Sequence, residues 1–453
     1  MQTNLCPIDL PDFGEIDAKP EVPPATYANR CGEAYRRAGC DWLVVYADRE
    51  HFANIVFLSG FEPRFEEALL LLGPGDRRVL ITGNECQSYA ALAQLAGLEL
   101  LLAQSMSLMG QDRSSRPKLV EVLKEAGIRT RDTVGLAGWK YLEPEEWETH
   151  APALFVPVFI FEALRLAIGS NGTIRDVTPC LMHPETGLRS IIDVDQIAAF
   201  EWAAARASSA LWRIVSGTRE NESEFEAVTR MDYQGDPLNT HVMFASGSGG
   251  PVVGLRSPTD RRIRRGDGVT SAIGLWGGLS SRAGLVTDYD EKFLKTACGY
   301  FEALITWYES AKLDVEGGAV FVAVTESLAR SGLRSALNPG HLTGHDEWVH
   351  TPIRAGSTDR LRSGMPFQVD IIPVPLSSGW ALNCEDPVIL ADSALRLELK
   401  TKHPVVWQRV EMRRRFVSEK IGVEIPESTL LISSTPLCLP PFWLAPGMLL
   451  ARV

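Results

Sequence analysis

Residues 266–284 read GDGVTSAIGLWGGLSSRAG, a stretch in which small and β-forming residues are interrupted by glycines. Glycine weakens helices and permits tight turns, so this composition predicts short strands rather than a helix. The same strand-like character continues upstream in FASGSGGPVVG at 244–254, and downstream in residues 365–374 and 387–390. The second half of the chain is therefore expected to contain a sheet.

A long amphipathic helix is expected before these strands. Apolar residues recur at steps of three and four from Ile197 to Ile214, which places them on one helical face. Asp193 and Asp195 lie near its start, where the helix dipole favours negative charge, and Gly217 ends it. Another helix is predicted from Ser223 to Met231.

The first half of the chain alternates between helical and strand patterns. This alternation indicates an α/β domain with a largely buried sheet. The expected strands are 41–46, 68–72, 79–82 and 133–137, and the expected helices are 31–38, 86–95 and 117–126.

Changes in composition mark the expected domain boundaries. Residues 1–27 are rich in proline and acidic residues, which predicts an extended arm lying on the body of the protein or on a partner subunit. Gly, Asn, Pro and Thr cluster in residues 169–187, where a boundary is placed. The predicted domains are accordingly 28–180 and 181–453.

The bulk composition is that of a soluble globular protein with two domains. The chain has 453 residues, of which 45% are hydrophobic, and a net charge of -12. This acidic balance argues against a nucleic-acid or anionic-membrane partner, since both require clustered basic charge. One basic run, Arg261 to Arg265, is interpreted as a solvated turn before a strand.

The cysteines and the N-terminus predict a cytoplasmic protein. The 8 cysteines are scattered and form no Cys-x-x-Cys pair, which indicates reduced thiols rather than a disulfide framework or a zinc knuckle. The N-terminus has acidic residues and no apolar core, unlike a signal peptide. Residues 154–168 are apolar but contain Pro157, Glu162 and Arg165, so they are interpreted as a buried strand or helix and not as a membrane span.

Six segments, in order along residues 30 to 400, resemble the creatinase/prolidase/aminopeptidase P family. They are 54–61 (NIVFLSGF), 191–204 (IIDVDQIAAFEWAA), 244–251 (FASGSGGP), 340–344 (GHLTG), 361–367 (LRSGMPF) and 383–388 (NCEDPV). The resemblance implies an α/β N-terminal domain of the creatinase/prolidase type, followed by an α+β pita-bread C-terminal domain. It also implies a homodimer with sites near the subunit boundary.

The resemblance further implies a metal site that has lost ligands. Metal-dependent members hold two divalent cations with two aspartates, one histidine and two glutamates, an oxygen-rich set suited to hard cations. Ala272 stands at the first aspartate position, and Arg282 or Ala283 at the second, depending on one gap. No metal cofactor is therefore expected.

Three of the family's ligand positions keep suitable side chains. They are His341, Asp370 and Glu385, and a single divalent metal on these three is left open. Creatinase similarly lacks the paired aspartates and acts without metal, using a histidine general base. Leu255 takes that position here and cannot act as a base, so the complete creatinase mechanism is not expected in this chain.

The expected site residues follow from these matches. A dense polar cluster, GHLTGHDEWVH at 340–350, supplies imidazoles beside carboxylates, and two neighbouring acids can divide acid and base roles between them. The predicted catalytic residues are His341, His350, Asp370 and Glu385. The predicted substrate-binding residues are Arg282, which would grip an anionic group or pair with the two acids, together with His241, His345 and Arg64. For Arg64 a salt bridge with Glu66 or Glu67 is the alternative.

Three functions remain open on the sequence. The first is a metal-independent hydrolase or lyase of a small polar amine or amide, related to Xaa-Pro peptidases and creatinase. The second is a non-catalytic homologue that binds a peptide or small molecule. The third is a dinuclear metal-dependent Xaa-Pro peptidase whose ligands are misaligned, in which Asp288 and Asp290 would take part after a shift of register.

Overall fold

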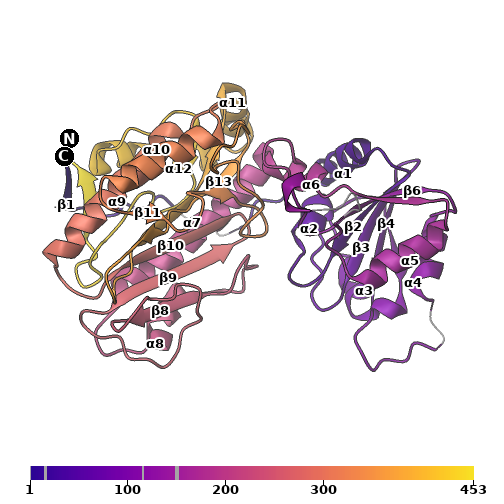
Figure 1. Ribbon diagram of the computed structural model, residues 1–453, viewed down its shortest axis with the longest axis horizontal. Coiled ribbons are helices and arrows are strands. Elements are labelled where there is room, and N and C mark those ends of the chain that lie inside the picture. Colours follow the sequence, from indigo (N-terminus) through magenta and orange to yellow (C-terminus); the bar gives the residue numbers. More distant parts are fainter. Residues whose placement is uncertain (1, 15–17, 115–116, 148–152) are drawn as a thin grey trace. The chain divides into compact units, whose positions relative to one another are not determined.

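The computed structural model describes residues 2–14, 18–114, 117–147 and 153–453. They form two compact units (Figure 1). One unit spans residues 22–190, and the other combines residues 1–21 with 191–453. Each unit has its own sheet and its own hydrophobic core.

The unit of residues 22–190 is built on a mixed sheet with the strand order β5-β4-β3-β2-β6-β7. Strand β3 pairs antiparallel with both β2 and β4, and the remaining neighbours are parallel. The strands are β2 (Trp42–Ala47), β3 (Ala68–Gly73), β4 (Arg77–Thr82), β5 (Leu98–Leu102), β6 (Thr133–Ala137) and β7 (Thr173–Asp176). The predicted α/β character of this half is confirmed.

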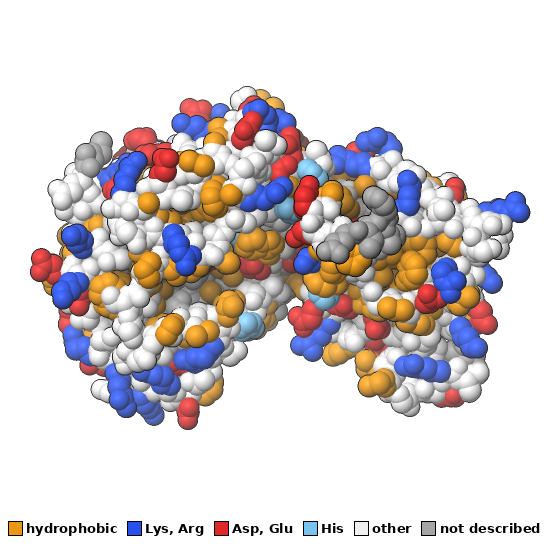
Figure 2. Space-filling view, in the orientation of Figure 1, with side chains coloured by type: hydrophobic (Ala, Val, Ile, Leu, Met, Phe, Trp, Pro, Cys, Tyr) orange, Lys and Arg blue, Asp and Glu red, His pale blue; other side chains and the backbone are white. Residues whose placement is uncertain are grey.

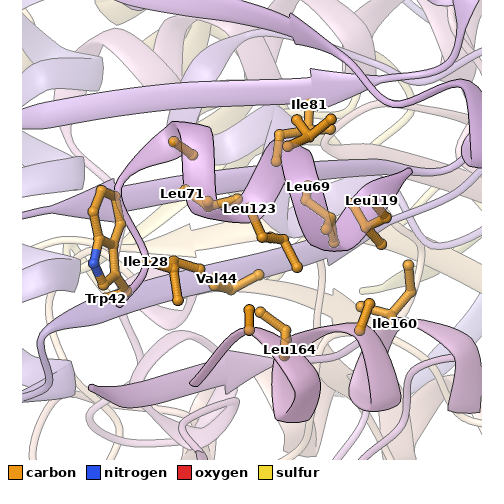
Figure 3. Close-up of a cluster of buried hydrophobic side chains, with 14 of the residues drawn as sticks. Trp42, Val44, Leu69, Leu71, Ile81, Leu119, Leu123, Ile128, Ile160 and Leu164 are labelled. Atoms are coloured by element: carbon orange, nitrogen blue, oxygen red, sulfur yellow. The ribbon is translucent and has the colours of Figure 1, made fainter. Parts of the chain in front are cut away.

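Helices supply the apolar faces that bury this sheet. They are α1 (Pro24–Ala38), α2 (Ala53–Ser59), α3 (Asn84–Ala90), α4 (Leu119–Ala126), α5 (Val158–Ile168) and α6 (Pro179–Met182). Figure 3 shows side chains of α4 and α5, such as Leu123 and Leu164, directed toward Val44, Leu69 and Leu71 of the sheet. The apolar stretch 154–168 thus contains a core helix.

Two boundaries differ from the predicted ones. Helix α1 begins at Pro24, because proline suits the first turn of a helix, so the expected arm ends before residue 27. At the other end, residues 181–190 stay with this unit. Arg37 of α1 donates a hydrogen bond to the carbonyl of Thr186, which ties that segment to α1.

The larger unit contains the sheet predicted from residues 266–284. Its strand order is β12-β13-β15-β10-β9-β8, and β16 pairs with β15. The strands are β8 (Met243–Gly247), β9 (Gly268–Leu275), β10 (Gly278–Leu285), β12 (His341–Leu342), β13 (Pro366–Val369), β15 (Asn383–Leu390) and β16 (Thr429–Leu431). A separate pair joins β11 (Arg334–Ser335) to β14 (Pro373–Val374). Strands β9 and β10 form an antiparallel hairpin, as the glycines at 277 and 278 suggest.

One long helix covers one face of the hairpin. Helix α7 (Val194–Gly217) is capped by Asp193, whose carboxylate accepts the Gln196 N–H at 2.9 Å. Its residues pack with Val269, Ile273 and Leu275, which are alternate residues of β9. The other helices of this unit are α8 (Glu224–Val228), α9 (Glu291–Ser310), α10 (Gly317–Ala329), α11 (Ser393–Lys402) and α12 (Pro404–Phe416).

The N-terminal residues belong to this larger unit. Strand β1 (Thr3–Pro7) pairs antiparallel with the C-terminal strand β17 (Met448–Arg452). Farther along, the Lys19 ammonium lies 5.1 Å from the ring centroid of Trp276 and 6.0 Å from that of Trp202. The described part of the arm therefore lies on the body of its own chain.

The arginines of the basic run are largely solvated, as expected, and three of them also form ion pairs. Figure 2 shows Lys and Arg side chains gathered near β8 and α8. Arg261 pairs with Asp267, Arg262 with Glu226, and Arg265 with Glu220 and Asp288.

All 8 cysteines are free thiols. Among the described helices, none is both long enough and apolar enough to cross a membrane.

Candidate functional site

The hairpin and its neighbours present two distinct faces. Ala272 of β9 lies opposite Ser281 of β10, which lies opposite Glu385 of β15. Paired residues of antiparallel strands point to the same side, so these three side chains share one face. We call this side of the sheet the site face. The other face carries Arg282, whose neighbours in the sequence, Ser281 and Ala283, point to the site face.

Hydrogen bonds between side chains join the strands across the site face. The Gln368 amide, from β13, donates to the carbonyl of Leu279 at 2.9 Å and to Glu385 Oε2 at 3.4 Å. The Asn383 amide donates to Glu385 Oε1 and to Ser281 Oγ. Glu385 is therefore held from both sides by amide donors.

His341 enters the same group from the edge strand β12. It is paired with Gln368, and its imidazole is fully buried. Its Nε2 lies 3.0 Å from Glu347 Oε1 and 4.0 Å from Asp370 Oδ2. The Trp348 ring stacks on the imidazole, with centroids 4.1 Å apart. His341, Glu347, Asp370 and Glu385 thus form one buried cluster, which we call the acid cluster.

Burial and mutual repulsion shift the protonation of the acid cluster. Burial, followed by the charges of Glu385 and Glu347, raises the pKa of Asp370 well above its usual value. Burial also raises the pKa of Glu385 to about 6, although the hydrogen bond from Asn383 opposes the rise. Burial alone would lower the pKa of His341, but the Glu347 carboxylate reverses this and raises it.

These shifts separate the roles of the two neighbouring acids. Asp370 therefore keeps its proton to a higher pH than an ordinary aspartate, while Glu385 ionises as the pH passes about 6. The charge of Glu385 contributes to the raised pKa of Asp370, which reflects how close the two side chains lie. One buried acid that can donate a proton beside one carboxylate that can accept a proton is a general acid/base arrangement.

Arg282 does not join the acid cluster. Its guanidinium is fully buried, and Nη2 contacts both carboxylate oxygens of Asp386, at 2.9 and 3.0 Å. It also donates to the carbonyls of Cys438, Thr435 and Glu385. Arg282 was predicted to contact Asp370 or the Glu385 carboxylate. None of these hydrogen bonds goes to either carboxyl group, because Arg282 faces the opposite side of the sheet. Its guanidinium is fully engaged by the protein.

The residues of the site face do not suit a dinuclear metal site. Ala272 and Ala283, the two positions on this face that would supply aspartates, carry only methyl groups. Both oxygens of Glu385 face amide donors, from Asn383 and Gln368. Within residues 2–14, 18–114, 117–147 and 153–453, no group of three or more His, Cys, Asp or Glu side chains is arranged to hold a metal ion.

The structure also locates the alternative metal ligands, Asp288 and Asp290, and the position of the missing general base, Leu255. Asp288 and Asp290 follow the end of β10; Asp288 pairs with Arg265, and Asp290 caps α9 through the Phe293 N–H. Both carboxylates are thus engaged by groups outside the acid cluster. Leu255 is exposed, and its carbonyl lies 2.8 Å from His241 Nε2. His241, itself exposed, is thus the imidazole beside the position of the missing base.

The other predicted histidines lie around the edge of the cluster. His345 is buried and packs edge-on against Phe200 and Trp276, with centroids 5.5 and 5.4 Å away. His350 forms a bridge with Leu342, and its Nδ1 accepts the N–H of Thr351 at 2.8 Å. These contacts are with aromatic rings and backbone, whereas His341 contacts carboxylates.

Arg64 belongs to the unit of residues 22–190. It pairs with Glu62 at 3.0 Å, and its guanidinium lies 5.5 Å from the ring centroid of Tyr89. Glu66, named as a possible partner, is instead buried and accepts backbone N–H groups of Cys86 and Leu108. A buried carboxylate tied to backbone amides is not available to a surface arginine.

Two residues of the site, Gln368 and Asn383, were not singled out from the sequence. Glu347 lay within the predicted polar cluster, but its pairing with His341 depends on how the loop folds. Gln368 and Asn383 each precede a predicted acid by two residues. Residues two apart in a strand share a face, so this spacing was a usable signal.

Comparison with known proteins supports the fold. No family model matches the sequence, and no curated protein matches it. An Xaa-Pro dipeptidase from Bacillus anthracis has a similar structure, with 19% identity and a TM-score of 0.60, covering 82% of this chain and 96% of the dipeptidase. The prolidase from Pyrococcus horikoshii OT3 gives 17% identity and a TM-score of 0.62, covering 81% and 95%.

A third similar structure extends the comparison to aminopeptidases. The X-Pro aminopeptidase from Thermotoga maritima MSB8 has 18% identity and a TM-score of 0.59, and the match covers 79% of this chain and 95% of the aminopeptidase. The chain therefore has the pita-bread fold of prolidases and aminopeptidase P, which confirms the fold predicted from the six sequence segments.

Proposed function

We propose that this chain, which has the fold of prolidases and aminopeptidase P, is a metal-independent hydrolase or lyase. Its substrate is a small polar amine or amide in which a C–N bond breaks. One observation carries the proposal: the buried acid cluster, in which a protonated Asp370 lies beside the Glu385 carboxylate and the His341–Glu347 pair.

Each residue of the cluster has a role in this reaction. Glu385 accepts a proton from water as the oxygen of that water bonds to the substrate carbon. Asp370 donates its proton to the nitrogen as the C–N bond breaks, so that the leaving group departs as a neutral amine. His341, charged through its contact with Glu347, stabilises negative charge that develops on a carbonyl oxygen.

The family's two-metal chemistry is not part of the proposal. In metal-dependent enzymes of this kind the cations generate the nucleophile and stabilise the charge. Ala272 and Ala283 offer no oxygen atoms for such ions. Proton transfer between buried carboxyl groups is the chemistry that the remaining side chains support.

A substrate screen tests the proposal. Guanidino, N-acyl and Xaa-Pro compounds would be incubated with the protein, with the His341→Ala variant as the control. We expect turnover that persists in EDTA, and a rate that rises as the pH passes about 6, where Glu385 ionises, then falls as Asp370 loses its proton. Loss of turnover in EDTA, or two metal ions per chain in elemental analysis, would refute metal independence.

A non-catalytic binding role is the second candidate, favoured by one observation. The amides of Asn383 and Gln368 both donate to Glu385, and hydrogen bonds to a carboxylate reduce its basicity. This candidate predicts that ligands bind without turnover across the whole screen. The homodimer and the cytoplasmic location stay predictions, and analytical ultracentrifugation would check the former.

A further inference from the structure

The site face carries mainly acidic side chains, although the sequence predicted that Arg282 would bind an anionic group there. The acid cluster contains three carboxyl groups and a single imidazole. In the described part of the chain, the contacts of Asp370, Glu385 and Glu347 include no Lys or Arg side chain. Arg282, the expected anion-binding residue, is bound to Asp386 on the opposite face. The site face therefore favours a cation over a carboxylate.

Hydrogen-bond acceptors without partners point to the same ligand. Among the described residues, Asp370 Oδ1 and Gln368 Oε1 are buried and have no hydrogen-bond partner. Both residues are more than nine-tenths buried, and both side chains contact the acid cluster, Gln368 through Glu385 and Asp370 through His341. Because the Gln368 amide nitrogen already donates to Leu279, its oxygen is left as an acceptor. A ligand rich in N–H groups would satisfy both atoms.

The neighbouring strands provide an apolar surface beside these acceptors. Met243, Ala272 and Leu279, from β8, β9 and β10, form a small hydrophobic cluster. Ala272 retains 6% of its exposure and Met243 retains 8%, whereas Ser271 on the other face of β9 retains none. The site face thus combines an acidic half with a largely buried apolar half.

We propose that the ligand of this face is a small organic cation that carries an alkyl group, namely an amine, amidine or guanidine. Its N–H groups donate to Asp370 Oδ1 and Gln368 Oε1, beside the Glu385 carboxylate. Its hydrocarbon part lies on Met243, Ala272 and Leu279. The inference deepens the proposed function, on which it rests in taking this face as the substrate site.

Three probes of similar size and different charge test the ligand class. Butylguanidinium (cationic), butylurea (neutral) and pentanoate (anionic) would be titrated into the full chain by calorimetry at neutral pH. We expect butylguanidinium to bind at least about tenfold more tightly than butylurea, because hydrogen bonds to charged groups are stronger, and pentanoate not to bind. Pentanoate binding as tightly as butylguanidinium, or no binding of any probe, would overturn the inference.

Variants locate the site. Glu385→Gln has nearly the same shape but lacks the ionised carboxylate, so it should weaken butylguanidinium binding at least about tenfold while changing butylurea binding much less. Ala272→Leu, on the apolar half, should weaken both. Glu326→Gln, on the exposed side of α10, is the control and should change neither. Unchanged cation binding in folded Glu385→Gln protein would contradict the assignment.

Binding and turnover separate the two proposals. If butylguanidinium binds as expected but no compound in the screen is cleaved, the proposed reaction fails and the ligand class stands. If an anionic compound is cleaved by the wild-type protein while cations do not bind, the ligand class fails and the enzymatic proposal stands.

Discussion

At the scale of single residues, Asp370 is buried where its charged form is unfavourable. Its pKa is raised in the folded chain, whereas in the unfolded chain it ionises near about 4. The folded state therefore binds the additional proton, and its stability decreases as the pH rises from about 4 toward the raised pKa. An asparagine side chain at this position cannot ionise and has nearly the same shape. We expect the free energy of unfolding of Asp370→Asn, relative to the wild type, to rise by up to about 1.4 kcal/mol for each pH unit in this window.

Urea unfolding at pH 5 and pH 8 measures this effect. The free energy of unfolding of Asp370→Asn, relative to wild type, should be higher at pH 8 than at pH 5. Glu326→Gln, which also removes a carboxylate but lies exposed on α10, should show no such pH dependence. An equal stability difference at both pH values would mean that Asp370 ionises normally in the folded chain.

Arg282 gives the second residue-scale prediction. Breaking a buried ion pair leaves an uncompensated charge. Arg282→Met should therefore lower the free energy of unfolding by about 3–5 kcal/mol, because the buried Asp386 carboxylate loses its cationic partner. Adding Asp386→Leu should recover most of the loss, because the second charge is then removed as well. Arg265→Met, at a half-exposed pair, should change the free energy of unfolding by less than about 1 kcal/mol. Thermal unfolding of the wild type and these three variants checks the series.

The difference between Arg282 and His341 shows what the sequence could determine at this scale. His341, Asp370 and Glu385 were predicted together from separate sequence segments, and the structure brings them together. For the second aspartate position, the sequence left Arg282 and Ala283 as alternatives. A shift of one residue moves a strand side chain to the other face, so a single undecided gap hid the role of Arg282.

At the scale of secondary-structure elements, the start of α7 was predictable because its signal is local. Asp193 accepts the Gln196 N–H at the N-terminus of this helix. Asp193→Ala should therefore lower the free energy of unfolding by about 1 kcal/mol. Asp193→Asn keeps an oxygen acceptor at the same place and should cost only a few tenths. Urea denaturation would compare the two, and an equal loss in both would assign the effect to charge rather than to capping.

Other elements needed information from beyond their own sequence. Residues 54–61 were matched only as a family segment, and the structure shows most of them in helix α2, which is buried along its whole length. Such a helix has no polar face and so no amphipathic period to read. The predicted helix at 86–95 ends at Ala90, since α3 is followed by a turn.

At the scale of the whole molecule, the chain order conceals which segments belong together. Residues 1–21 form one unit with residues 191–453, and residues 22–190 form the other. The link is the pairing of β1 with β17, in which Thr3 lies opposite Arg452. An arm was predicted from composition, but a partner strand at the far end of the chain leaves no local pattern in the sequence.

This arrangement predicts how the chain can be divided. Residues 22–190 have a complete core of their own and should unfold cooperatively in urea as an isolated fragment. Residues 191–453 alone would leave the edge of β17 unpaired and remove the Glu302 contact with Thr3, so this fragment should be less stable and prone to aggregate.

Gln2 and Val453 exchange backbone hydrogen bonds at 3.0 and 3.2 Å, so the two ends are adjacent. Joining residues 1–21 after Val453 through a linker of about four residues should restore the melting temperature, because β1 can then pair with β17 as a hairpin. A permuted chain no more stable than residues 191–453 alone would show that β1 contributes little to this unit.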